Sequence, residues 1–209
     1  MLSVIIPVYN EVNTIEKIVL KIKKIKNIKT QIIIVDDGST DGTTEKLKNI
    51  KSMFKIDNVI FSKKNRGKGY AIKLAQKSIS QKFTIIQDAD LEYNPREYRN
   101  LLKPIAEDKA DVVYGSRFIG GTHRVLYFWH YLGNKILTLL SNIFSNLNLT
   151  DMETCYKMFR RDILRDINLK SNRFGFEPEF TAKIAKANLR IYELPISYYG
   201  RTYKDGKKI

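Results

Sequence analysis

The sequence has a single cysteine and no long uncharged apolar run. Cys155 alone excludes an internal disulfide and a thiolate metal cage, which fits a reducing compartment. No stretch offers about 18 apolar residues without a charge, so we expect no segment that spans a bilayer. The N-terminus lacks the basic region, apolar core and cleavage site of a signal peptide. These absences predict a cytoplasmic protein.

Two familiar phosphate-binding loops are missing as well. No G-x-G-x-x-G follows the first apolar segment, and no G-x-x-x-x-G-K-[ST] occurs anywhere, which excludes the dinucleotide-dehydrogenase and P-loop classes. The stretch 37–42 begins like a calcium-binding loop. Its twelfth position is Lys48, where a bidentate Glu is required, so it is not an EF-hand.

Length and composition indicate one α/β domain with an appendage, or at most two small domains, and an anionic partner. The 209 residues are 43% hydrophobic and 11% aromatic, which is enough for a core and too much for a disordered chain. The net charge of +15 favours nucleic acid, a phosphorylated small molecule or an acidic membrane surface. Composition does not choose among these three.

Apolar strand patterns alternate with helix patterns about every 25 residues in the first half of the chain. Strands are expected at 2–7, 31–35, 59–62, 83–86 and 111–114, with helices at 15–26, 43–50, 70–80 and 96–107. Further helices are expected at 132–147 and at 152–161, another helix starts within 173–179, and a last strand is expected at 189–196. This alternation predicts an α/β fold with a parallel sheet and helices on both faces.

The segment 83–94 organises the rest of the chain. Its apolar start reads as a buried strand, and Asp88, Asp90 and Glu92 follow at alternating positions. In an extended chain these three carboxylates point the same way, and they repel one another unless a cation holds them together. A metal site is one interpretation. A solvated turn before Pro95 is the other.

Acidic residues also follow the first two strands. Glu11 comes after the first, and Asp36 and Asp37 end the second. Because the carboxyl ends of parallel strands meet at one edge of a sheet, we expect these acids and those after residue 87 to share one crevice. Turn and cap chemistry is the alternative for the acids at 36–41, and it is preferred for Asp41.

Five short motifs, in order and at compatible spacing, resemble family 2 glycosyltransferases of the GT-A fold. They occupy residues 7–11, 35–39, 65–69, 88–90 and 115–118. Within that family the chain is most similar to the dolichyl- and polyprenyl-phosphate mannosyl- and glucosyltransferases. The resemblance implies a mixed, mainly parallel sheet and transfer of a hexose, with inversion, from GDP-mannose or UDP-glucose to a polyprenyl phosphate. It implies no nucleic-acid partner.

The resemblance also implies site residues. Those around the nucleoside would be Pro7, Tyr9, Glu11, Val35 and Asp37, with Asp88 and Ala89 on the ribose and diphosphate. Asp90 and Glu92 would hold Mg²⁺ or Mn²⁺, and Arg117 would meet a phosphate. Arg201 and Lys207, or Lys208 in its place, would close over the diphosphate. The family often has Gln at position 92, so Glu92 makes this site more anionic.

The nature of the acceptor decides whether a general base is needed. A phosphate acceptor is already ionised at neutral pH and needs little help. A sugar hydroxyl would require a base, for which Asp151 and Glu153 are candidates. The N-terminus of a helix at 152–161 is the preferred explanation for both residues.

The stretch after Arg117 indicates a membrane surface. A basic loop, 120–124, contains Arg124 as a candidate substrate contact, and the aromatic segment 125–132 contains the only Trp. The helix expected at 132–147 is strongly amphipathic, which fits either core packing or an interfacial element beside anionic lipid. We favour the interfacial interpretation, with the protein peripheral on the cytoplasmic face. His123 and His130 are expected to be structural.

We therefore expect one GT-A domain, with a nucleotide-sugar half at 1–118 and an acceptor half at 119–209. Three other classes remain open. A basic nucleic-acid-binding domain would explain the charge but not the acids at three strand ends. A sugar-nucleotide synthesising enzyme would need a glycine-rich basic loop where residues 8–11 stand. A family 2 enzyme with a saccharide acceptor differs only in its acceptor.

Overall fold

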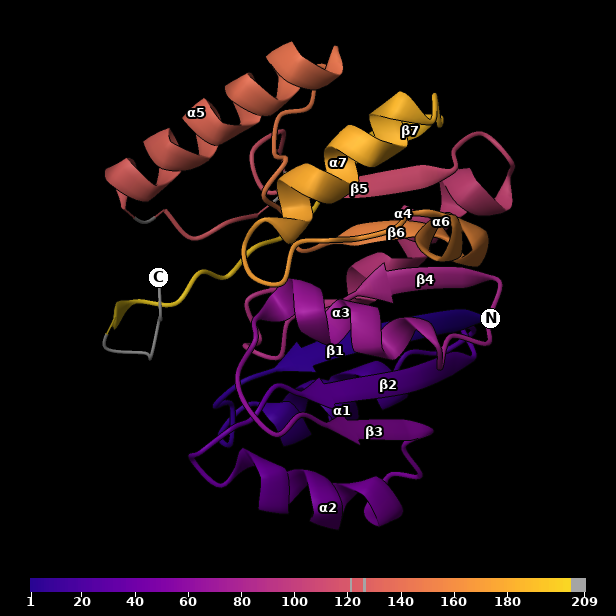
Figure 1. Ribbon diagram of the computed structural model, residues 1–209, viewed down its shortest axis with the longest axis vertical. Helices are drawn as coiled ribbons and strands as arrows, with labels where there is room; N and C mark the ends of the chain where they lie inside the picture. Colours follow the sequence, from indigo (N-terminus) through magenta and orange to yellow (C-terminus); the bar gives the residue numbers. More distant parts are fainter. Residues whose placement is uncertain (121, 126, 204–209) are drawn as a thin grey trace.

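The computed structural model describes residues 1–120, 122–125 and 127–203, and one seven-stranded sheet runs through the chain (Figure 1). The strands are β1 (Leu2–Val8), β2 (Thr30–Asp36), β3 (Asn58–Phe61), β4 (Phe83–Ile86), β5 (Val112–Ser116), β6 (Lys157–Arg160) and β7 (Ile191–Pro195). The helices are α1 (Ile15–Lys23), α2 (Thr43–Met53), α3 (Lys68–Gln76), α4 (Tyr98–Ala106), α5 (Phe128–Ser145), α6 (Arg161–Asp166) and α7 (Phe176–Lys186), with a 3₁₀ turn η1 (Pro95–Glu97).

The sheet has the order β3-β2-β1-β4-β6-β5-β7. All neighbouring pairs are parallel except those of β6, which runs antiparallel to both β4 and β5. Six strands therefore end at the same edge. The expected mixed, mainly parallel sheet is confirmed, and Figure 1 shows α3 in front of it and α1 behind. Wholly buried aliphatic side chains of β1 and β2 fill the core between these layers.

Strand β6 replaces the helix that was expected at 152–161. Asp151 does not cap a helix, because its carboxylate is bound on both oxygens by Arg117. The residues after it form a turn, and Met158 then pairs with Ile85 on one side and Val113 on the other. Burial between two strands outweighs the helical pattern of this segment. Only its last residue, Arg161, begins a helix.

Helix α5 presents its polar side to the protein and its apolar side to solvent. Only Thr138 is buried, and its Oγ1 accepts a hydrogen bond from the backbone N–H of Met152 (3.1 Å). Lys135 Nζ donates to the carbonyl of Thr150 (3.2 Å), and Asn142 exchanges hydrogen bonds with the backbone of Leu149. The exposed apolar side chains are Phe128, Trp129, Tyr131, Ile136, Leu137, Leu139, Leu140, Ile143 and Phe144. We call these nine residues the apolar face of α5.

Core packing therefore does not explain the amphipathic pattern of α5. The helix also begins at Phe128, four residues before the expected start, so the aromatic segment forms part of it. In Figure 1 it lies beyond α7, away from the sheet. Within residues 1–120, 122–125 and 127–203, no helix combines the length and apolar character needed to cross a membrane.

Candidate active site

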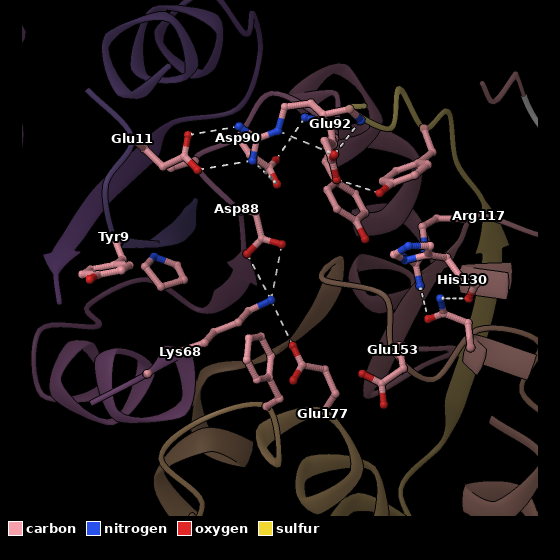
Figure 2. Close-up of a pocket in the computed structure, with 18 of the residues that line it drawn as sticks. Tyr9, Glu11, Lys68, Asp88, Asp90, Glu92, Arg117, His130, Glu153 and Glu177 are labelled. Atoms are coloured by element: carbon pink, nitrogen blue, oxygen red, sulfur yellow. Dashed lines mark hydrogen bonds and ion pairs between the residues drawn. The ribbon is translucent and has the colours of Figure 1, made fainter. Parts of the chain in front are cut away.

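A cavity of about 1080 Å³ opens at the edge where the parallel strands end (Figure 2). Glu11 follows β1, Asp37 follows β2 and Asp88 follows β4, and all three line this cavity. Arg117, which follows β5, lines it from the other side. The expected convergence of acids from distant sequence positions is present in the structure.

Most of the residues singled out in the sequence share this cavity. Those that line it are Pro7, Tyr9, Glu11, Asp37, Asp88, Ala89, Asp90, Glu92, Arg117 and Arg201. Val35 and Arg124 are not among the lining residues. The side chain of Val35 is 0% exposed and packs in the core, so it does not reach the cavity. Arg124 is exposed, and its Nη1 donates to the carbonyl of Gly200 (3.3 Å). Lys207 and Lys208 lie outside the described residues.

The guanidinium of Arg201 lies among three carboxylates. Its Nη2 is 3.3 Å from Glu11 Oε1 and 3.5 Å from Asp90 Oδ2, and its Nε is 3.6 Å from Glu92 Oε1. Burial, together with the charges of Asp88 and Glu92, raises the pKa of Asp90 to about 7. This cluster therefore holds more negative charge than Arg201 neutralises.

Glu92 holds the C-terminal segment. Its Oε1 accepts from the backbone N–H of Arg201 (2.7 Å), and its Oε2 accepts from the Tyr198 hydroxyl (2.6 Å). Its carbonyl accepts from the N–H of Tyr199 (2.9 Å). Position 92 thus ties residues 198–201 to the loop after β4. The metal role expected of Glu92 stays a prediction, since both of its oxygens already have protein partners.

The carboxylates fit a hard divalent cation that is completed by substrate. Among the described residues, no three His, Cys, Asp or Glu side chains converge closely enough to hold an ion by themselves. Mg²⁺ characteristically uses one or two carboxylates plus substrate phosphate oxygens, which is what Asp90 and its acidic neighbours provide. An oxygen-only set suits Mg²⁺ or Mn²⁺ over softer metals. The excess negative charge around Asp90 is the feature that a cation would relieve.

The other acids after β2 have local roles. Asp36 accepts from the N–H of Ser39 (3.0 Å), and Asp41 accepts from the N–H of Thr43 (3.0 Å), so both stabilise the turn between β2 and α2. Asp37 accepts from the backbone N–H groups of Arg66 and Gly67. It thereby fixes the glycine-bearing turn before α3. The turn chemistry expected of Asp41 is confirmed, although the N-cap residue of α2 is Gly42.

Lys68 and Glu177 form a site that the sequence did not indicate. Lys68 Nζ lies 3.0 Å from Asp88 Oδ1 and 2.9 Å from Glu177 Oε1. Glu177 is only 4% exposed, so a favourable interaction with the dipole of α7 does not by itself account for it. An acid inside the run Phe174–Phe180, otherwise mostly apolar, was the available signal.

Arg117 is held by its neighbours. Its Nε and Nη2 donate to the two oxygens of Asp151 (2.7 Å each), and Nη2 also donates to Asn134 Oδ1 (3.1 Å). Asp151 is 0% exposed and engaged by this pair, which removes it as a general base. Glu153 lines the cavity, and burial and the charge of Glu177 raise its pKa. Of the two candidate bases, Glu153 is the one with access to a substrate.

Sequence comparison identifies the family. The family model "Glycosyl transferase family 2" matches residues 3–167. Glycosyltransferase AglJ of Haloferax volcanii is 26% identical over 199 residues, which are 95% of this chain and 63% of AglJ. Undecaprenyl-phosphate mannosyltransferase of Micrococcus luteus is 29% identical over 218 residues, covering 97% and 85%. Dolichol-phosphate mannosyltransferase of Pyrococcus furiosus is 26% identical over 209 residues, covering 98% and 58%. The chain thus spans less than two thirds of two of these three relatives.

Structural comparison agrees. Glucosyl-3-phosphoglycerate synthase from Mycobacterium tuberculosis, in complex with Mn²⁺, uridine diphosphate and glucosyl-3-phosphoglycerate, superposes with a TM-score of 0.76 at 18% identity. The match covers 98% of this chain and 74% of that one. At this identity the likeness shows the fold, and the expected GT-A architecture is confirmed. Fold and family match together show that the chain belongs to glycosyl transferase family 2.

Proposed function

We propose that the protein transfers mannose or glucose, with inversion and with Mg²⁺ or Mn²⁺, from GDP-mannose or UDP-glucose to a polyprenyl phosphate. One observation carries this proposal. A single cavity has Asp88 and Asp90 on one side and Arg117 on the other, and it is lined also by Phe128 and Tyr131 of the apolar face of α5. It therefore joins a place for a diphosphate, a place for a second phosphate and an apolar surface.

The donor would lie along the ends of β1, β2 and β4. Tyr9 and Asp37 line the cavity there and are our candidates for contacts to the nucleoside, with Asp88 and Ala89 beside the ribose and diphosphate. Asp90 would bind a divalent cation, which would neutralise charge on the departing phosphate. Arg201, already within 3.5 Å of Asp90, would add a second fixed positive charge at the same place.

The acceptor phosphate would lie at Arg117. Nε and Nη2 of its guanidinium are committed to Asp151 and Asn134, which fixes the orientation of the side chain. The residue lines the cavity, so a phosphate bound there would meet a side chain that is already oriented. A phosphate that carries its own negative charge attacks without a base, so this arrangement needs no further catalytic group.

The apolar face of α5 would hold the lipid side of the reaction. Trp129 is 76% exposed and Phe144 87% exposed, and a continuous apolar surface of this kind on a basic protein fits insertion between lipid headgroups. Both the Micrococcus luteus and Pyrococcus furiosus relatives carry a polyprenyl or dolichol phosphate in their names. We propose peripheral attachment to an anionic membrane through α5.

Glu153 supports a second acceptor class. A carboxylate that lines the cavity and has a raised pKa is suited to take a proton from a sugar hydroxyl. In that case the protein would elongate a saccharide, and the E153Q variant would lose transfer. With a phosphate acceptor, the same variant would retain it.

Transfer of label decides between these acceptors. The purified chain would be incubated with GDP-[³H]mannose or UDP-[³H]glucose, Mn²⁺ and one of three acceptors: a short polyprenyl phosphate, the matching unphosphorylated polyprenol or an oligosaccharide. We expect label in the organic phase only with the phosphate. Label in a saccharide acceptor supports the second class, and no transfer from either donor to any acceptor contradicts the proposed function.

A further inference from the structure

We infer that Glu177, held in place by Lys68, binds hydroxyl groups of the transferred hexose and so contributes to the choice of sugar. The inference rests on the proposed function, because it places the hexose of a nucleotide sugar in the same cavity. It assigns a role to a buried acid that the metal and phosphate sites do not use.

Glu177 is a buried carboxylate with one unused oxygen. It lies in the first turn of α7 and is 4% exposed, yet it lines the cavity. Oε1 is 2.9 Å from Lys68 Nζ, whereas Oε2 has no hydrogen-bond partner among the residues that the structure describes. An unsatisfied oxygen on a buried carboxylate is costly, and a donor from a bound ligand would satisfy it.

The charge of this region selects hydroxyl groups over phosphate. Asp88, Glu153 and Glu177 line the same part of the cavity, and Lys68 bridges the first and the last. Burial opposes the positive charge of Lys68, but the acidic groups around it, Asp88 foremost and Glu177 among them, together outweigh burial and raise the lysine pKa well above its usual value, so the amine stays charged. Because Lys68 is already held by Asp88 and Glu177, this region of the described chain offers a ligand hydrogen-bond acceptors and no free cation. Neutral hydroxyl groups, which donate hydrogen bonds, are the matching ligand.

The position of Glu177 suits the sugar of a bound donor. Figure 2 shows the Nζ of Lys68 between Asp88 and Glu177, with Glu153 beside Glu177 and Arg117 above Glu153. A hexose attached to a diphosphate at Asp88 and Asp90 would therefore point toward this group, between the donor and acceptor phosphates. Phe174, 65% exposed, also lines the cavity and offers an apolar surface to a sugar ring.

A purely structural ion pair between α3 and α7 is the competing explanation for Glu177. Such a pair would use the carboxylate only to hold Lys68. Its loss would then weaken binding of the bare nucleotide and of the nucleotide sugar to the same extent. If Glu177 instead binds the sugar, loss of its carboxylate weakens binding of the nucleotide sugar alone. The two explanations therefore differ in a measurable ratio, that of the Kd values for nucleoside diphosphate and nucleoside diphosphate hexose.

The test is calorimetric titration of wild type and the E177Q variant with GDP, GDP-mannose, UDP and UDP-glucose in the presence of Mn²⁺. Gln keeps an oxygen that can accept from Lys68, so the fold is preserved, and thermal melting checks this. We expect E177Q to weaken binding of the preferred nucleotide sugar about tenfold, as for loss of a hydrogen bond to a charged group, with the nucleotide Kd unchanged. The E45Q variant on α2, with a side chain 71% exposed, is the control.

Deoxy-hexose donors sharpen the test. Removing the hydroxyl that Glu177 accepts from should weaken binding to wild type but not to E177Q, whereas removing any other hydroxyl should affect both equally. If E177Q loses the same affinity for nucleotide and nucleotide sugar, or loses no affinity, the inference is wrong but the proposed function is unaffected. Wild-type protein that binds neither nucleotide sugar overturns the proposed function, and the inference falls with it.

Discussion

Arg201 Nη2 lies 3.5 Å from Asp90 Oδ2, although 111 positions separate the two residues in the sequence. The contact exists because Glu92 accepts hydrogen bonds from Tyr198 and from the backbone of Arg201, which brings the C-terminal segment onto the loop after β4. The acidic cluster after β4 and residues 198–201 are therefore one unit. The same guanidinium that neutralises the acids is in place to contact a diphosphate bound there.

The D90N variant tests the cation site. We expect hexose transfer to fall to background and Mn²⁺ to lose its effect on nucleotide affinity, because Asp90 would be the main protein ligand of the ion. The fold should survive, since the change removes one charge from a cluster with excess negative charge. Calorimetric titration of UDP and GDP with and without Mn²⁺ measures the effect. Full activity in D90N would refute the metal assignment.

The R201A variant separates catalysis from binding. We expect transfer to slow about a hundredfold, as for loss of one preorganised charge at the departing phosphate, while the Kd for the nucleoside diphosphate changes only a few-fold. Steady-state rates and nucleotide titrations, run on the same preparation, give both quantities. R201K should recover part of the rate. A wild-type rate in R201A would remove the closing role.

The apolar face of α5 can be tested without any substrate. Replacing Ile143 and Phe144, which are 64% and 87% exposed, by Asp should abolish sedimentation with vesicles that contain anionic lipid, because the charged side chains oppose insertion. M53D on α2, which changes a residue 66% exposed, is the matched control and should bind like wild type. Equal binding by all three proteins would show that α5 does not contact the membrane.

Gly69 is required by a close backbone contact. A Cβ at this position would lie 2.6 Å from the carbonyl oxygen of Ser171, so G69A must displace the loop that precedes α7. We expect the free energy of unfolding to fall by about 1–3 kcal/mol in a denaturant titration. G133A on α5, where a Cβ meets nothing within 4 Å, is the control and should be neutral or slightly stabilising. Equal stability of both variants would contradict this account.

Glu179 makes stability depend on pH in the acid range. Burial raises its pKa, but hydrogen bonds from Lys183 and from the backbone of Lys170 and Ser171 outweigh burial and lower it to about 2. Its stabilising effect is therefore complete above about pH 5 and is lost as the pH falls toward 2. The stability difference between wild type and E179Q should shrink by roughly 2 kcal/mol over this range. A difference independent of pH would contradict the assignment.

Local patterns in the sequence were enough to predict the sheet edge and the acidic residues that lie along it. The apolar runs of β1, β2 and β4 are short and fully buried, and the acids follow them directly, so parallel strand order alone brings Glu11 and Asp88 together. The membrane-facing interpretation of α5 also followed from its pattern, and the exposed apolar face agrees with it. These features depend on neighbouring residues in the chain.

Features set by distant contacts were not predictable. Residues 152–161 have a helical pattern, but partners from β4 and β5 draw 157–160 into the sheet. Glu177 looks like an ordinary first-turn acid, and only its distance from Lys68, contributed by another helix, reveals a buried charge. Val35 matched a family motif, yet the side chain points into the core. In each case the deciding partner lies tens of residues away.

The antiparallel strand β6 has a consequence for biosynthesis. It supplies the only link between β4 and β5 in the order of the sheet, and it is made some forty residues after β5. A nascent polypeptide that has emerged only as far as residue 118 exposes two unpaired edges, so a fragment cut there would be prone to aggregate. Strands β4 and β5 can be joined through β6 only once residue 160 has left the ribosome.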